Sequence, residues 1–151
     1  MKVIATNRQA RHKYELFEKF EAGIVLQGFE VKSLREGRVN LSDSYVRILR
    51  GEVFLIHCHI SPYSHIQNIN LADPVRSRKL LLRQDEIDKL KGVTASKGRT
   101  IVPLSIYFKQ GLAKVEIAVA RGKQEFDKRE TIKRRIADRE ASRAMKGRNR
   151  R

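Results

Sequence analysis

The sequence of 151 residues has one cysteine, three prolines and no tryptophan. Because Cys58 has no second cysteine to pair with, an internal disulfide is excluded and we expect a reducing compartment. No apolar run approaches the roughly 20 residues that cross a bilayer, and residues 1–10 contain no apolar signal core. We therefore expect a cytoplasmic protein built around one compact domain, with a core of Val, Ile, Leu and Phe.

Acidic residues are also scarce relative to basic ones. The chain has 33 Lys and Arg against 17 Asp and Glu, which gives a formal net charge of +16. Such an excess repels itself and does not stabilise a fold, so it indicates a polyanionic partner. Nucleic acid is the first candidate. An anionic membrane would require a broad amphipathic helix or a lipid anchor, and the sequence shows neither, so we expect no membrane partner.

The positive charge is concentrated after residue 120. Residues 121–151 hold 13 basic and 5 acidic residues, and their apolar stripe is thin, with Ile132 and Ile136 one helical turn apart. We predict a body over residues 1–120 and a basic C-terminal tail over 121–151. The tail is expected to be disordered when free and helical when bound to a negative partner. The alternative is a tail that only aids solubility.

The body is expected to be mainly β. Alternating apolar and polar residues predict two hairpins, and Tyr14–Leu26 favours a further strand. The hairpins are Ser44–Arg50 with Val53–Ile60, and Ile101–Lys109 with Leu112–Arg121, turning at Arg50–Glu52 and at Gln110–Gly111.

Strict period-two alternation assigns faces to these strands. One strand is expected to divide into Phe54, Ile56, Cys58 and Ile60 on one face and Val53, Leu55, His57 and His59 on the other. The last strand is expected to turn Val115, Ile117 and Val119 to the core and Lys114, Glu116, Ala118 and Ala120 away from it.

Three short helices are expected around the strands. They are Arg8–Lys13 capped by Asn7, Phe29–Glu36, and Asp85–Lys91 ending at Gly92. Several short strands with turn signals favour a small closed barrel. An OB-like barrel fits, and periodicity alone leaves an SH3-like barrel open.

No constellation of residues predicts catalysis. His57 and His59 lack the carboxylate or cysteine that would complete a metal site, and Ser61, Ser64 and His65 lack the context of a catalytic nucleophile. We expect no enzymatic activity, no metal and no cofactor. An RNA-processing enzyme would require clustered acid–base or metal groups.

Basic clusters beside aromatic rings are typical of RNA-binding proteins, because phosphates pair with the cations and bases stack on the rings. The clusters are Arg8/Arg11/Lys13, Arg76/Arg78/Lys79/Arg83 and Lys97/Arg99. The rings are Tyr14, Tyr45, Tyr63, Tyr107 and Phe126. These features alone predict an RNA-binding barrel, and they fit a general RNA-binding protein or a ribosome-assembly factor equally well.

Several longer blocks narrow this prediction. The blocks are Asn7–Tyr14, Glu21–Ile24, Gly28–Arg35, Asp43–Tyr45 followed by Gly51–Glu52, Arg78–Leu82, and Gly122–Lys123 followed by Asp127–Arg129. In this order they resemble the tmRNA-binding small protein B family, and the resemblance extends from Asn7 to the C-terminus.

The resemblance implies an OB-fold-like barrel with peripheral helices and a basic tail. It implies binding to the tRNA-like domain of tmRNA, around the D-loop and elbow, and delivery of tmRNA to stalled ribosomes for trans-translation. The body would replace an anticodon arm, while the tail would enter the decoding centre and empty mRNA channel of the small subunit. Alanyl-tRNA synthetase and elongation factor Tu would be indirect partners through the charged tmRNA.

The resemblance also implies residue roles. The tmRNA-binding residues would be Asn7, Arg11, His12, Glu21, Leu81 and Lys114. The ribosome-binding residues of the tail would be Lys123, Phe126, Asp127, Lys128, Arg129, Lys133 and Arg134. The chemistry of three residues leaves alternatives: Asn7 as a helix cap, Leu81 as a core residue, and Glu21 as a structural carboxylate paired with Arg or Lys. Phe126 stands where the family often has His or Tyr, so it keeps stacking but loses a hydrogen bond.

Overall fold

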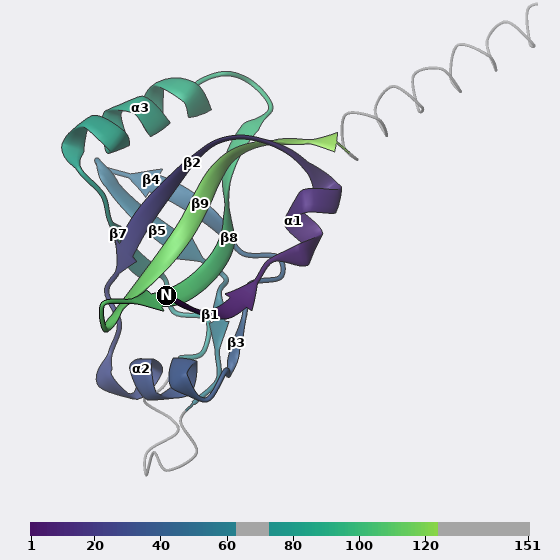
Figure 1. Ribbon diagram of the computed structural model, residues 1–151. Coiled ribbons are helices and arrows are strands. Elements are labelled where there is room, and N and C mark those ends of the chain that lie inside the picture. The colour runs from purple at the N-terminus through teal and green to yellow at the C-terminus, as the bar shows by residue number, and fades with distance from the viewer. Residues whose placement is uncertain (63–72, 124–151) are drawn as a thin grey trace, which may run out of the picture.

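The computed structural model describes residues 1–62 and 73–123 (Figure 1). The expected tail residues from Phe126 to Arg134, and the ring of Tyr63, lie outside these ranges. The elements in chain order are β1 (Lys2–Thr6), α1 (Arg8–Lys13), β2 (Tyr14–Ile24), α2 (Gly28–Arg35), β3 (Val39–Asn40), β4 (Tyr45–Leu49), β5 (Glu52–Ile56), β6 (His59–Ile60), β7 (Arg78–Leu81), α3 (Gln84–Thr94), β8 (Arg99–Lys109) and β9 (Leu112–Gly122).

Antiparallel pairing closes the main sheet into a barrel. The strand order is β1-β8-β4-β5-β7-β2-β9, and β8 also pairs with β9. The ring therefore runs β8-β4-β5-β7-β2-β9 and back to β8, with β1 added beside the second half of β8. In this ring β4 lies three strands from β2 in either direction, and Figure 1 shows β4 and β5 behind β2 and β9. The mainly β, OB-fold-like barrel with three short peripheral helices in the described residues is confirmed.

Both predicted hairpins form. β4 pairs with β5, and β8 pairs with β9 from Arg99↔Arg121 to Lys109↔Leu112. Gln110 and Gly111 connect β8 to β9 with φ of 52° and 76°, which is the pair of positive φ values that a tight two-residue hairpin turn requires. The barrel interior is filled by aliphatic side chains from every strand of the ring, among them Ala22, Val46, Leu55, Leu80, Ile106 and Ile117.

The predicted faces of 53–60 are wrong beyond Leu55. Val53 and Leu55 are buried, whereas His57 and His59 are exposed and Cys58 is fully buried. His57 has φ of 60°, which ends β5 at Ile56 and inserts one residue into the alternation. Strict period two fails across this insertion, so the core continues through Cys58 and Ile60 instead.

Two residues expected to face away from the core are buried. Ala118 and Ala120 form a second, smaller cluster with Ala10, Val102 and Leu104, on the outer side of the barrel beneath α1. The small side chains let α1 approach the sheet closely, so the outer face of β9 is partly a core face. The alternation of Val115, Ile117 and Val119 toward the main core is confirmed.

The helix limits differ slightly from the sequence prediction. α3 continues through Gly92 to Thr94, because Gly92 adopts helical geometry and does not act as a stop. β1 and β7 were not predicted, since five and four residues are too few to establish a period. Among the described residues, no helix has the length and apolar character needed to cross a membrane.

Candidate RNA interface

A row of residues crosses four neighbouring strands on the outer face of the barrel. Gly23 of β2 lies between Leu81 of β7 and Lys114 of β9, and Lys114 lies opposite Tyr107 of β8. Leu81 is 53% exposed, so the interpretation of Leu81 as a core residue is wrong. Glu21 stands two residues from Gly23 on the same face of β2. The register of four strands therefore brings together three predicted tmRNA-binding residues: Glu21, Leu81 and Lys114.

Glu21 is held by partners from β8. The Tyr107 hydroxyl donates to Glu21 Oε2 at 2.5 Å, and Lys109 Nζ lies 3.4 Å from the same oxygen. The hydrogen bond from Tyr107 and the positive charge of Lys109 lower the pKa of Glu21. Burial and the adjacent carboxylate raise the pKa of Tyr107. Tyr107 and Lys109 thus hold the carboxylate in place and favour its ionised form, and the Glu21 side chain remains partly exposed.

Sequence analysis did not predict that Tyr107 and Lys109 hold Glu21. Tyr107 was expected as a stacking ring, but it is only 4% exposed and instead positions Glu21. The two residues are 86 positions apart, and no local pattern pairs them. Only the three-way pairing of β2, β9 and β8 makes them neighbours.

Asn7 binds the backbone of β8 where the pairing of β8 with β9 shifts in register. The register of β8 against β9 shifts between Pro103 and Ser105. The backbone N–H of Asn7 donates to Leu104 O at 2.7 Å, and Asn7 Nδ2 donates to Pro103 O at 2.9 Å. Asn7 stands at the start of α1, but its side chain makes no capping hydrogen bond, so the cap interpretation is wrong. At 8% exposure, the side chain holds α1 against the sheet.

Arg11 and His12 are exposed on α1, on the surface that Asn7 fixes. Arg11 lines a groove with Arg8, Val3 and Glu116. Glu116 is two residues beyond Lys114 on β9, so the groove lies between the basic edge of α1 and the strand that carries Lys114. His12 does not line the groove. Lys123 is exposed immediately after β9, and the other predicted tail residues lie outside the described ranges.

One member of a predicted basic cluster does not lie at the surface, whereas Lys79 and Arg83 of the same cluster are exposed. Arg78 is fully buried: its Nε donates to Glu30 Oε2 at 2.6 Å, and its Nη1 donates to Cys58 O at 2.6 Å. Arg76 pairs with the other oxygen of Glu30, which is also fully buried. Arg78 therefore neutralises a buried carboxylate of α2 and is unavailable to RNA. The pairing spans 48 residues, so no local pattern indicates it.

The outer face of β7, β2 and β9 carries groups that can bind RNA. It combines a fixed carboxylate acceptor, a lysine, an exposed leucine and a basic helix edge, and these groups can bind phosphates, 2′-hydroxyls and base edges. Within residues 1–62 and 73–123, no three His, Cys, Asp or Glu residues are grouped to hold a metal ion. Burial raises the pKa of the Cys58 thiol to about 11.

Comparison with known proteins agrees with this chemistry. The SmpB protein family matches residues 4–147. The SsrA-binding proteins of Geobacillus thermodenitrificans and Halalkalibacterium halodurans are 55% and 56% identical, and the alignments cover 97% and 99% of this chain and 94% and 96% of those proteins. A solved structure described as "tmRNA-SmpB: a journey to the center of the bacterial ribosome" is similar with a TM-score of 0.68 and 48% identity, over 82% of this chain and 85% of that one. The chain belongs to the SmpB family.

Proposed function

We propose that this protein binds the tRNA-like domain of tmRNA and delivers it to stalled ribosomes for trans-translation. The outer face of β7, β2 and β9 holds the tRNA-like domain around its D-loop and elbow. The observation that carries the proposal is the row Leu81–Gly23–Lys114, with Glu21 two residues along β2, across strands that pair side by side. The names of its relatives, which specify SsrA binding, support the same partner.

The groups of this face have complementary roles. Lys114 supplies a positive charge for a phosphate. Glu21, kept ionised by Tyr107 and Lys109, accepts a hydrogen bond from a base or a 2′-hydroxyl. Leu81, which is exposed, makes apolar contact with a sugar or base. Asn7 acts by holding α1, and Arg11 and His12 approach the RNA from that helix.

The basic tail gives the protein its second task. The body over residues 1–120 takes the place of an anticodon arm, and the tail over 121–151 enters the decoding centre and empty mRNA channel of the small subunit, where it becomes helical. Lys123, Phe126, Asp127, Lys128, Arg129, Lys133 and Arg134 make the ribosomal contacts. The net charge of +8 over the tail supports a partner lined by phosphates. The protein works in the cytoplasm and makes or breaks no bond itself, and charged tmRNA links it to alanyl-tRNA synthetase and elongation factor Tu.

Two measurements test the proposal. A competition experiment compares the affinity for the tRNA-like domain with that for an unrelated structured RNA of equal length. We expect a clear preference for the tRNA-like domain, and a Lys114→Gln variant is expected to lower the log–log salt slope by about one. Equal binding of both RNAs would favour a general RNA-binding protein and contradict the proposal.

The tail is tested separately. A chain ending at Asp127 is expected to bind the tRNA-like domain as the full chain does, while failing to support tagging of stalled peptides in a reconstituted translation system. Tagging by the shortened chain would overturn the role given to the tail. The same truncation leaves the outer face intact, so the two roles are separable.

A further inference from the structure

We propose that the groove between β1 and α1 binds one guanosine of the tRNA-like domain, turned out of its base stack, with the carboxylate of Glu116 accepting hydrogen bonds from the guanine. This inference rests on the proposed function and deepens it, because it names a nucleotide type and the residue that discriminates it. The groove has a volume of about 310 Å³, and residues of three strands and one helix line it, among them Val3, Thr6, Arg8, Arg11, Ser105 and Glu116.

The groove belongs to the same outer face as Glu21 and Lys114. Glu116 of β9 lies opposite Glu21 of β2 and opposite Ser105 of β8, and Ser105 lies opposite Thr6 of β1. Residues at directly paired positions of neighbouring strands present their side chains on one face of the sheet. The tRNA-like domain can therefore rest on β7, β2 and β9 and extend into the groove without leaving this face.

The groove lies where two strand pairings are irregular. β8 shifts its register with β9 between Pro103 and Ser105, and β1 shifts its register with β8 between Val3 and Ala5. Such bulges bend a strand, change the direction of its side chains and are frequent beside functional sites. The volume of about 310 Å³ is at the lower end of the about 300–1,000 Å³ typical of ligand pockets, so the groove has room for one nucleotide.

Glu116 is the unexpected residue of this groove. It lies directly opposite Glu21, and like charges at paired positions of a sheet lower stability. Glu21 has Lys109 as a partner, whereas Glu116 forms no ion pair within residues 1–62 and 73–123. A carboxylate repels phosphate, so on a face that binds RNA it can attract only groups that donate hydrogen bonds. The position of Glu116 therefore favours contact with the edge of a base.

Guanine is the base whose donor groups fit a carboxylate. Its N1–H and N2–H groups lie side by side, so both oxygens of Glu116 can accept at once. The N–H of uracil lies between two carbonyl oxygens, and the amino groups of adenine and cytosine lie beside an acceptor nitrogen. These three bases would therefore place an acceptor against the carboxylate. An unstacked base in an RNA loop exposes the edge that carries these groups.

Two arginines supply positive charge for the phosphate of the same nucleotide. Arg8 and Arg11 are three residues apart on α1, so they lie on one side of the helix, and both line the groove. Both are exposed, and neither forms an ion pair in the parts of the chain that the structure describes. The phosphate can thus lie toward α1 and the base toward β9, while the ribose passes over Val3, which is 50% exposed.

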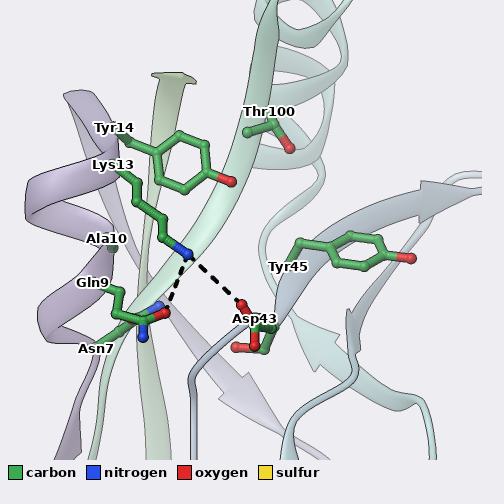
Figure 2. A pocket seen from close by; sticks show the side chains of 9 residues that line it. Asn7, Gln9, Ala10, Lys13, Tyr14, Asp43, Tyr45 and Thr100 are labelled. Carbon is green, nitrogen blue, oxygen red and sulfur yellow. Dashed lines mark hydrogen bonds and ion pairs between the residues drawn. The ribbon is translucent and has the colours of Figure 1, made fainter. Parts of the chain in front are cut away.

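The basic residues of α1 point to two different sides. Lys13 lies beside Gln9 and Asp43 and lines a separate hollow, which Figure 2 shows. Arg8 and Arg11 line the groove and do not line that hollow. These two arginines are therefore the α1 cations that a nucleotide in the groove meets.

The direction in which one substitution changes the affinity tests the proposal. Glu116→Met keeps the length of the side chain and removes both acceptor oxygens and the negative charge. With a guanosine in the groove, the Kd of the full chain for the tRNA-like domain is expected to rise about tenfold, as the loss of a bidentate base contact implies. Without a base partner, removing a negative charge from an RNA-binding face leaves the Kd unchanged or lowers it. Either of these two results would overturn the proposal.

A matched control separates the groove from a general effect of charge. Glu18→Met makes the same change on β2, where Glu18 pairs with Lys89 of α3 and does not line the groove. Its Kd is not expected to rise, and an equal rise for both variants would contradict the proposal. Because Glu116→Met removes the repulsion from Glu21, thermal unfolding is expected at the same or a higher temperature. If the variant is not folded, Glu116→Gln repeats the test with one acceptor oxygen kept and a smaller expected rise in Kd.

Inosine substitution identifies the guanosine, because inosine lacks only the N2 amino group. Copies of the tRNA-like domain with inosine phosphorothioate at random guanosine positions are bound to each protein, and iodine cleavage of the bound fraction maps the positions at which inosine is excluded. We expect one position that excludes inosine with the parent protein and with Glu18→Met, and accepts it with Glu116→Met. The same exclusions for all three proteins would overturn the groove as a guanine site. Failure of the proposed function has a different signature: the parent protein would show no preference for the tRNA-like domain, and Lys114→Gln would have no effect.

Discussion

Gly23 and Leu81 face each other across β2 and β7 so closely that a Cβ on Gly23 would lie 3.3 Å from Leu81 Cβ. Leu81 would have to shift by a few tenths of an ångström with its backbone, because its Cβ is not the flexible end of the side chain. We expect Gly23→Ala to weaken binding of the tRNA-like domain several-fold while changing the free energy of unfolding by less than about 1 kcal/mol, since the smaller backbone entropy of Ala in the unfolded chain offsets the strain. Gly28→Ala is the matched control, because a Cβ there meets no atom within 4 Å. Equal affinities for the two variants would show that the position of Leu81 is unimportant for binding.

Asn7 is expected to act on stability more than on direct RNA contact. Asn7→Ala removes the hydrogen bond to Pro103 O, and we expect the free energy of unfolding in urea to fall by about 1–3 kcal/mol. His12→Ala, on the exposed surface of the same helix, is expected to stay within about 0.5 kcal/mol. An Asn7→Ala variant with unchanged stability and weakened RNA binding would instead make Asn7 a contact residue.

Because Arg78 is paired with the buried Glu30, replacing Arg78 is expected to lower the free energy of unfolding far more than replacing Arg76. Arg78→Met leaves the Glu30 carboxylate buried without its main partner, and we expect a loss of about 3–5 kcal/mol in unfolding free energy. Arg76→Gln is expected to cost clearly less, because the Arg76 side chain is 31% exposed and Arg78 remains. Thermal unfolding in the absence of RNA is the measurement, and similar losses for the two variants would contradict the account.

The pKa of Glu21 predicts a pH dependence with a defined sign. Because folding lowers this pKa below the ordinary 4.5, the ionised carboxylate contributes stability that is fully present above pH 4.5 and is lost as the pH falls through the folded-state pKa. Glu21→Gln should therefore be less stable than the parent protein at pH 7, with a difference that narrows below pH 4.5. Urea unfolding of both proteins at several pH values measures this difference. A constant difference would show that Tyr107 and Lys109 do not favour the ionised form.

Much of the barrel could be predicted because its hairpins are local. Apolar and polar residues alternate through Val115, Ile117 and Val119, and Gly111 in the turn suits the positive φ that it adopts. The phase change at His57 could not be predicted, because nothing in its sequence neighbourhood requires the positive φ. The burial of Ala118 and Ala120 depends on α1, which the pairing of β2 with β9 places against them.

Some residues of the candidate site could also be predicted from the sequence, and others could not. The resemblance indicated Glu21, Leu81 and Lys114, and the strand register gives these residues a common face. Tyr107 and Lys109, which hold Glu21, and Glu30, which removes Arg78 from the surface, act across 46 or more positions of the chain. Their roles depend on contacts between strands and helices that are distant in the sequence. Neither the alternation of apolar residues nor a cluster of charges in the sequence indicates such contacts.

The guanidinium of Arg78 anchors the chain on both sides of residues 63–72. Its Nη1 donates to Cys58 O, and its Nη2 donates to Pro74 O, which also accepts the backbone N–H of Ile60. Because one side chain holds both Cys58 and Pro74, it sets the positions of these two residues relative to each other, whatever number of residues connects them. Residues 63–72 are therefore a permissive position for an inserted epitope or a fluorescent label, and a reporter placed there would leave the outer face and the C-terminus unmodified.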